Sequence, residues 1–128
     1  MSKEKAVLII DDMKLVRMRL RQLCEKIGFT HITEAVNGKE AWQTLQKMKP
    51  APDLILTDYN MPDMNGMEFL NLARKSEAHL KTPVVFITSE SDKSLILNAV
   101  MLGATDYVVK PFQDEVLSKK IVNLLAGT

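Results

Sequence analysis

The sequence predicts an α/β fold in which a doubly wound, five-stranded parallel sheet is flanked by five helices. Short, continuous apolar runs recur along the 128 residues, and such runs are typical of strands that are buried on both faces. Between these runs lie segments whose apolar residues recur at helical spacing. Regular alternation of strand and helix favours parallel strands joined by crossover helices. The length suits one domain, so we expect residues 1–128 to form a single domain.

The first half of the chain contains two strand–helix units. The run AVLII predicts a strand at Ala6–Ile10, and the helical spacing that follows predicts a helix at Met13–Ile27, which Gly28 ends. A second strand is predicted at His31–Val36. A second helix is predicted at Lys39–Met48, entered through an Asn-Gly pair and ended before two prolines.

The second half of the chain repeats the pattern three times. Strands are predicted at Asp53–Thr57, Pro83–Thr88 and Tyr107–Val109. The helices that follow them are predicted at Gly66–Ser76, Asp92–Leu102 and Gln113–Leu125.

The fourth predicted helix is more apolar than one buried face requires. Six large apolar residues lie within eight positions: Leu95, Ile96, Leu97, Val100, Met101 and Leu102. Two interpretations stay open. Either the helix docks deeply and buries a broad stripe, or it exposes an apolar patch that a partner protein binds.

Composition and charge exclude several classes of protein. A formal net charge of +1 gives no global field that would favour nucleic acid or a membrane surface. The single cysteine, Cys24, excludes an internal disulfide and is expected to pack inside the protein. His31 and His79 are expected at the surface. No transmembrane run or signal peptide is recognised, so we expect a cytoplasmic protein.

Polar residues lie at the ends of four predicted strands. Asp11 and Asp12 follow the first strand, Asp58 follows the third, Thr88 ends the fourth and Lys110 follows the fifth. Each residue alone has an ordinary alternative role, such as capping the next helix. In a parallel sheet, however, the carboxyl ends of the strands meet at one edge, where ligands bind. The sequence therefore predicts a site there.

The predicted cluster carries more negative charge than one lysine neutralises. Three neighbouring carboxylates repel one another, so either some are protonated or a cation is present. A set of hard oxygen ligands favours Mg²⁺ over zinc. Carboxylates with Mg²⁺, a lysine and a hydroxyl suit a phosphoryl group, and Asp58 would be the nucleophile that becomes an acyl phosphate. The metal and Lys110 would neutralise the developing charge.

These motifs resemble the receiver domains of bacterial two-component response regulators, and most closely the single-domain chemotaxis receivers of the CheY type. The matching stretches are "VLIIDD", "LTDYNMPDMNG", "VVFITS" and "YVVKPF", so the resemblance covers essentially the whole chain. It implies a flavodoxin-like (CheY-like) fold with strand order 2-1-3-4-5. It also implies a signalling switch that a histidine kinase phosphorylates and that dephosphorylates itself, rather than an enzyme.

The resemblance implies a role for each matching residue of the site. Asp58 matches the phosphoacceptor. The metal ligands would be Asp58, Asp12, the backbone carbonyl of Asn60, and Asp11, the last mainly through water. Lys110 matches the lysine that contacts the phosphoryl group, and its bond to the following proline matches one that is cis in the family.

Four more positions match residues that regulate the family's response. Thr88 and Tyr107 match the switch hydroxyl and the switch aromatic residue. Asn60 and Glu90 match two positions that tune hydrolysis of the acyl phosphate.

Output is expected to come from docking to another protein, because no DNA-binding segment follows the last predicted helix. A monomer that acts on a chemotaxis target such as the flagellar motor switch is the favoured interpretation. We expect the output surface on the fourth helix, fifth strand and fifth helix, with contacts from Asp92, Ile96, Val100 and Tyr107. The alternative is a receiver domain excised from a hybrid kinase or a transcriptional regulator.

Two other classes share parts of this pattern. Phosphatases of the haloacid-dehalogenase class also use an aspartyl nucleophile with Mg²⁺, but they carry a second acid two residues later, where this chain has Asn60. Flavodoxin-like flavin binders need a hydroxyl- and glycine-rich loop after the first strand, where this chain has Asp11 and Asp12. Both classes are disfavoured.

Overall fold

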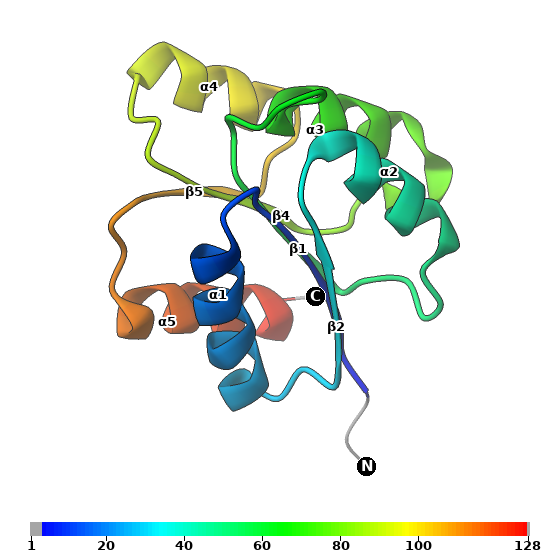
Figure 1. Ribbon diagram of the computed structural model, residues 1–128, viewed down its shortest axis with the longest axis vertical. Helices are drawn as coiled ribbons and strands as arrows, with labels where there is room; N and C mark the ends of the chain where they lie inside the picture. Colours follow the sequence, from blue (N-terminus) through cyan, green and yellow to red (C-terminus); the bar gives the residue numbers. More distant parts are fainter. Residues whose placement is uncertain (1–3, 128) are drawn as a thin grey trace.

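A computed structural model describes residues 4–127 and confirms the predicted α/β fold (Figure 1). The five strands form one parallel sheet in the order β2-β1-β3-β4-β5. The strands are β1 (Ala6–Ile10), β2 (His31–Ala35), β3 (Leu54–Thr57), β4 (Val84–Thr88) and β5 (Asp106–Val109). The helices are α1 (Lys14–Ile27), α2 (Gly38–Lys47), α3 (Gly66–Lys75), the short 3₁₀ helix η1 (Glu77–His79), α4 (Lys93–Met101) and α5 (Asp114–Ala126).

The helices cover both faces of the sheet. Helices α1 and α5 lie on one face, and α2, α3 and α4 lie on the other (Figure 1). Alternate residues of each central strand face opposite sides, so Val7 and Ile9 of β1 pack with α1 and α5, while Leu8 and Ile10 pack with α2 and α3. Both faces of β1 are therefore buried, which explains why its five residues are all apolar.

Predicted element boundaries agree with the structure to within one residue. Helix α1 ends at Gly28, whose φ of 118° lies in the left-handed region that favours glycine.

The helix η1 was not predicted. It buries His79, so the expectation that this histidine lies at the surface is wrong. Burial and the nearby guanidinium of Arg74 both lower the pKa of His79.

Cys24 packs in the core beside α5, as expected, and burial raises the pKa of its thiol to about 12.

None of the helices within residues 4–127 has the length and apolarity that a membrane crossing requires.

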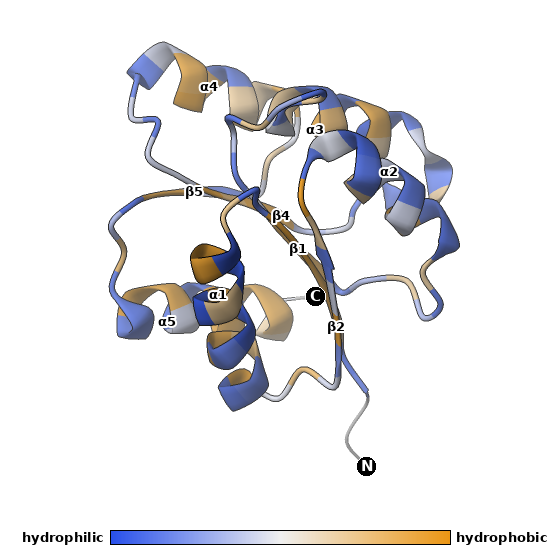
Figure 2. Cartoon of the chain, in the orientation of Figure 1, coloured by the Kyte–Doolittle hydropathy of each residue, from blue (hydrophilic) through white to orange (hydrophobic). Residues whose placement is uncertain are grey.

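Helix α4 exposes most of its apolar side chains, which decides between the two interpretations of its sequence. Ala99 is its only buried residue. Leu97, Val100 and Met101 are 59%, 51% and 74% exposed. The apolar colouring of α4 is visible at the outside of the molecule (Figure 2). A broad buried stripe is therefore wrong for this helix, and the apolar patch faces solvent.

Candidate functional site

The strand register brings the predicted site residues to one edge of the sheet. Backbone hydrogen bonds continue past the strand ends and fix three of these residues. The amide of Asp11 donates to Ala35 (N–O 3.1 Å), the amide of Asp58 to Ile10 (2.9 Å) and the amide of Lys110 to Thr88 (2.8 Å). Each of these residues thus follows its strand directly but keeps a sheet-like backbone position.

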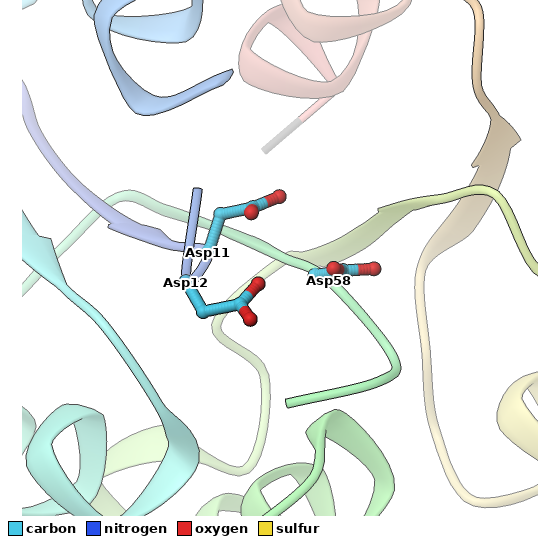
Figure 3. Close-up of side chains that lie close together, drawn as sticks. All are labelled: Asp11, Asp12 and Asp58. Atoms are coloured by element: carbon cyan, nitrogen blue, oxygen red, sulfur yellow. The ribbon is translucent and has the colours of Figure 1, made fainter. Parts of the chain in front are cut away.

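Three carboxylates meet at this edge, as predicted. One oxygen each from Asp11, Asp12 and Asp58 lies within 4.8 Å of the other two (Figure 3). Asp11 and Asp58 are buried, whereas Asp12 is exposed. The cluster is therefore open to solvent on the side of Asp12.

Lys110 is the ammonium group of the cluster. Its Nζ donates to Asp11 Oδ2 at 2.9 Å and lies 3.7 Å from Asp58 Oδ2. The Lys110–Pro111 peptide bond is cis, as the resemblance implied. Burial raises the pKa of Asp11, although the hydrogen bond from Lys110 and the Met13 amide act against that rise. One ammonium thus faces two of the three acids and leaves an excess of negative charge.

The donor atoms of the cluster fit a hard divalent cation. They are carboxylate oxygens, which Mg²⁺ prefers over sulfur or imidazole. Asp11 is already engaged on both oxygens, by the Met13 amide and by Lys110. Asp58 Oδ1 accepts from the Tyr59 amide. Asp12 is the exposed acid of the three; a direct contact of Asp12 with the metal and a water-mediated contact of Asp11 stay predictions.

The loop after Asp58 is shaped by close backbone contacts. A Cβ on Gly66 would lie 2.3 Å from the carbonyl oxygen of Asp58, so only glycine lets the start of α3 approach this closely. Asp63 has a φ of 68°, a left-handed conformation that aspartate tolerates. Asn65 caps α3 and forms a reciprocal capping box with Glu68. The loop thus turns within a few residues between Asp58 and the start of α3 at Gly66.

Asn60 and Glu90 lie together, although 30 positions separate them in the sequence. Asn60 Nδ2 donates to Glu90 Oε2 at 3.2 Å, in an exposed position at the edge of the site. The two side chains that match the hydrolysis-tuning positions are therefore one hydrogen-bonded pair.

Thr88 and Tyr107 lie on the adjacent strands β4 and β5, where the register pairs Tyr107 with Phe86 and Thr88 with Val109. Thr88 is fully buried, and its Oγ1 accepts from the Glu90 amide at 3.2 Å. Tyr107 Oη donates to the Glu90 carbonyl at 2.9 Å, and its ring stacks on Phe86 with centroids 5.6 Å apart. Burial, followed by the charge of Glu90, raises the pKa of Tyr107 to about 12, so the phenol keeps its proton. Thr88 and Tyr107 thus both bond the same loop residue, Glu90.

The predicted partner residues lie on or beside α4. Asp92 is exposed and caps the helix by accepting from the amides of Ser94 and Leu95. Ile96 is half-buried and Val100 is exposed. Tyr107 is half-buried at the neighbouring strand. Leu97 and Met101, which belong to the apolar set of the sequence analysis but were not among the expected contacts, are more exposed than Ile96.

Sequence reasoning missed an ionic network that reaches the site from β2. Glu34 accepts from Arg17 (Nε–Oε1 2.9 Å) and from Arg21 (Nε–Oε2 2.8 Å), and Arg17 also donates to the carbonyl of Asp11 at 2.7 Å. The one available signal was a charged residue inside a predicted strand, since Glu34 is the fourth residue of HITEA.

Comparisons with known proteins agree on one family. The family model described as "Response regulator receiver domain" matches residues 7–122. A "Chemotaxis protein CheY homolog" from Campylobacter jejuni is 34% identical over 119 residues, which cover 93% of this chain and 91% of that protein. The chemotaxis response regulator CheY4 of Vibrio cholerae superposes with a TM-score of 0.86 at 30% identity, covering 95% of this chain and 99% of that one.

A second solved structure is the receiver domain of a histidine kinase and not a chemotaxis response regulator. The receiver domain of a signal transduction histidine kinase from Syntrophus aciditrophicus also superposes with a TM-score of 0.86, at 29% identity, covering 97% of this chain and 92% of that one. The fold alone therefore suits both kinds of receiver.

Proposed function

The chain belongs to the family of response regulator receiver domains, and we propose on that basis that it is a switch controlled by phosphorylation of Asp58. In this proposal residues 1–128 form one receiver domain. It takes a phosphoryl group from a histidine kinase in the presence of Mg²⁺, and then binds a target protein as a cytoplasmic monomer. A chemotaxis target such as the flagellar motor switch is favoured, because relatives of this chain are named as chemotaxis proteins.

One observation carries the proposal. Lys110 Nζ contacts Asp11 and faces Asp58 within a cluster of three carboxylates, at the carboxyl ends of β1, β3 and β5. This arrangement puts a nucleophile, a fixed positive charge and the ligands of a hard cation in one place. A structural ion pair alone would not need the two further acids, whose mutual repulsion costs free energy.

The proposed reaction is transfer of a phosphoryl group to the Asp58 carboxylate. A carboxylate oxygen bonds to phosphorus as the phosphorus–nitrogen bond of the donor histidine breaks, and the imidazole leaves with the electron pair. The Tyr59 amide holds Asp58 Oδ1 at 2.8 Å and orients the carboxylate. Lys110 supplies positive charge beside Asp58 Oδ2. Bound Mg²⁺ would add charge stabilisation for the phosphoryl oxygens.

The direct test is incubation of the protein with acetyl phosphate and Mg²⁺, followed by intact-mass measurement. A Mg²⁺-dependent gain of one phosphate supports the proposal, and a protein that stays unmodified under these conditions would contradict it. Absence of yellow colour and of phosphatase turnover on phosphate monoesters separates this function from the two disfavoured classes.

Asn60 and Glu90 are expected to speed loss of the phosphoryl group. The two side chains form a hydrogen-bonded pair, and we expect this pair to hold a water near the phosphorus. If each side chain contributes about 1 kcal/mol through one net hydrogen bond, Asn60→Ala or Glu90→Ala should slow decay of the acyl phosphate by about fivefold. The measurement is the decay of phosphorylated protein after the donor is removed.

Ser89→Ala provides a control for this decay, because Ser89 is the exposed neighbour of Glu90. Unchanged decay in both the Asn60 and Glu90 variants would show that these residues are bystanders.

The proposed output surface consists of α4, β5 and α5. A phosphoryl group on Asp58 would offer oxygens to the Thr88 hydroxyl, which now accepts from the Glu90 amide. Movement of Thr88 would vacate space into which the Tyr107 ring could turn, and a ring swap gives two discrete packings. Phosphorylation shifts the population only if it favours one of the two. Because Tyr107 bonds Glu90 in the loop that precedes α4, the same movement would reach α4.

Binding of a target is therefore expected to depend on α4 and Tyr107. Ile96→Ala, Val100→Ala and Tyr107→Ala should each weaken binding of the phosphorylated protein to a motor-switch peptide by about tenfold, as buried apolar and aromatic anchors do. Binding can be measured by fluorescence anisotropy of the labelled peptide.

Leu15→Ala is the matched control, because Leu15 is a 76% exposed apolar residue of α1, on the other face of the sheet. If Leu15→Ala destroys binding while the three α4–β5 variants retain it, the output surface lies elsewhere. If no chemotaxis peptide binds the phosphorylated protein, the alternative of a receiver from a larger regulator gains support.

A further inference from the structure

We propose that Arg17, held in place by Glu34, is a positioning residue for the Mg²⁺ site. It would fix the Asp11–Asp12 peptide through the Asp11 carbonyl, while Lys110 holds the Asp11 carboxylate. This inference rests on the proposed function and deepens it, because it names what orients the metal-binding acids.

Arg17 links α1, β2 and the end of β1. Its Nη1 donates to the carbonyl oxygen of Asp11 at 2.7 Å, and its Nε donates to Glu34 Oε1 at 2.9 Å. The Arg17 side chain is only 13% exposed. Arg21, one turn later on α1, donates to the second oxygen of Glu34 at 2.8 Å and to the carbonyl of Ile32. Glu34 thus receives one guanidinium on each carboxylate oxygen.

Every polar atom of Asp11 has a partner. Its amide, carbonyl, Oδ1 and Oδ2 are bonded respectively to Ala35, Arg17, Met13 and Lys110. The carbonyl of Asp11 and the amide nitrogen of Asp12 belong to one planar peptide unit. The hydrogen bond from Arg17 therefore fixes the plane from which the Asp12 backbone departs. Asp12 is the exposed acid of the cluster. The direction of its side chain therefore depends on the orientation of that peptide plane.

Glu34 has a second effect, because it keeps a permanent positive charge away from the three acids. An arginine does not lose its proton in proteins, so a released Arg17 side chain could turn toward the carboxylates and compete with a cation. Burial alone would raise the pKa of Glu34, but the hydrogen bonds from Arg21 and Arg17 outweigh it and lower that pKa. Glu34 therefore stays ionised at neutral pH and holds Arg17 in place.

A positioning role and a purely electrostatic role of Arg17 predict different Mg²⁺ affinities for Arg17→Lys. If Arg17 acted only as a charge, removing it would strengthen Mg²⁺ binding, and Arg17→Lys would leave the affinity unchanged. If Arg17 acts by geometry, Arg17→Lys should weaken binding even though the charge is kept. An ammonium group on a flexible stem cannot reproduce the planar fork that bonds two acceptors at once.

The experiment is a Mg²⁺ titration of the unphosphorylated protein, followed by the backbone amide NMR shifts of Asp12 and Tyr59 at constant ionic strength. These signals report the folded protein, so a loss of stability does not imitate a loss of affinity. Arg17→Lys and Glu34→Gln should each raise the Kd by about tenfold, the lower end of the range for partners that orient metal ligands. Both substitutions break the same Arg17–Glu34 contact. The double variant should therefore raise the Kd by the same factor as one single variant, and not by the product of the two factors.

Arg19→Lys is the control, since it lies on the same helix but bonds Phe112 and Asp114 at the start of α5. Its Kd should equal that of the wild-type protein. A wild-type Kd in Arg17→Lys, an equal loss in Arg19→Lys, or multiplying factors in the double variant would each overturn the inference. If the wild-type protein itself binds no Mg²⁺, the proposed function fails; if it binds Mg²⁺ and the variants match it, only this inference fails.

Discussion

Asp12→Ala is expected to abolish Mg²⁺ binding and, at the same time, to make the metal-free protein more stable. Asp12 is the exposed member of a cluster whose three carboxylates lie within 4.8 Å of one another, and Lys110 contacts only the other two. Each repulsive pair at that distance costs about 1 kcal/mol where water screens it. Removing one acid relieves two such pairs, or about 2 kcal/mol in all, so the unfolding midpoint without metal should rise by roughly 6 °C.

Thermal melts with and without Mg²⁺ measure both effects. The wild-type protein should gain stability from Mg²⁺, because a ligand that binds only the folded state stabilises it, whereas Asp12→Ala should not respond. Glu25→Ala is the control: Glu25 is an exposed carboxylate near the opposite end of α1, and its removal should leave the response to Mg²⁺ intact. Unchanged Mg²⁺ affinity in Asp12→Ala would refute the site.

The fold was predictable because its signals are local. Each central strand reads as a continuous apolar run, since both of its faces are covered by helices. The site was predictable for a related reason: its residues follow directly after strands, and a parallel sheet brings those positions to one edge. The side-chain pairing of Lys110 with Asp11 joins positions 99 residues apart, so no spacing in the sequence could have specified it.

Exposure of α4 could not be predicted because it depends on tertiary contacts that leave little local trace. Its C-terminal end is held by Arg74 of α3, which donates twice to the carbonyl of Gly103, and its packing relies on the small residue Ala99. Large apolar residues around a small buried one look the same in sequence whether the helix docks deeply or shallowly. His79 was misjudged because a short 3₁₀ turn, which has no clear sequence signature, carries it inward.

Replacement of Asp58 is expected to eliminate phosphorylation completely. Asp58 is 8% exposed, its carboxylate is oriented by the Tyr59 amide, and it is the acid nearest Lys110 apart from Asp11. Asp11 cannot substitute for it, because both of its oxygens are already hydrogen-bonded. Asp58→Asn keeps the shape of the side chain but removes the nucleophilic oxygen, so the fold should survive while the chemistry is lost.

Asp63→Asn is the matched control for this variant. Asp63 is an exposed acid of the same loop, and asparagine also tolerates its left-handed φ of 68°. This variant should be phosphorylated like the wild-type protein, which would show that the loss in Asp58→Asn does not come from disturbing the loop.

The central claim is tested most directly by the intact mass of the wild-type protein, Asp58→Asn and Asp63→Asn after incubation with acetyl phosphate and Mg²⁺. The account predicts a gain of one phosphate on the wild-type protein and on Asp63→Asn, and none on Asp58→Asn. A phosphate that remains on Asp58→Asn at the wild-type level would contradict it.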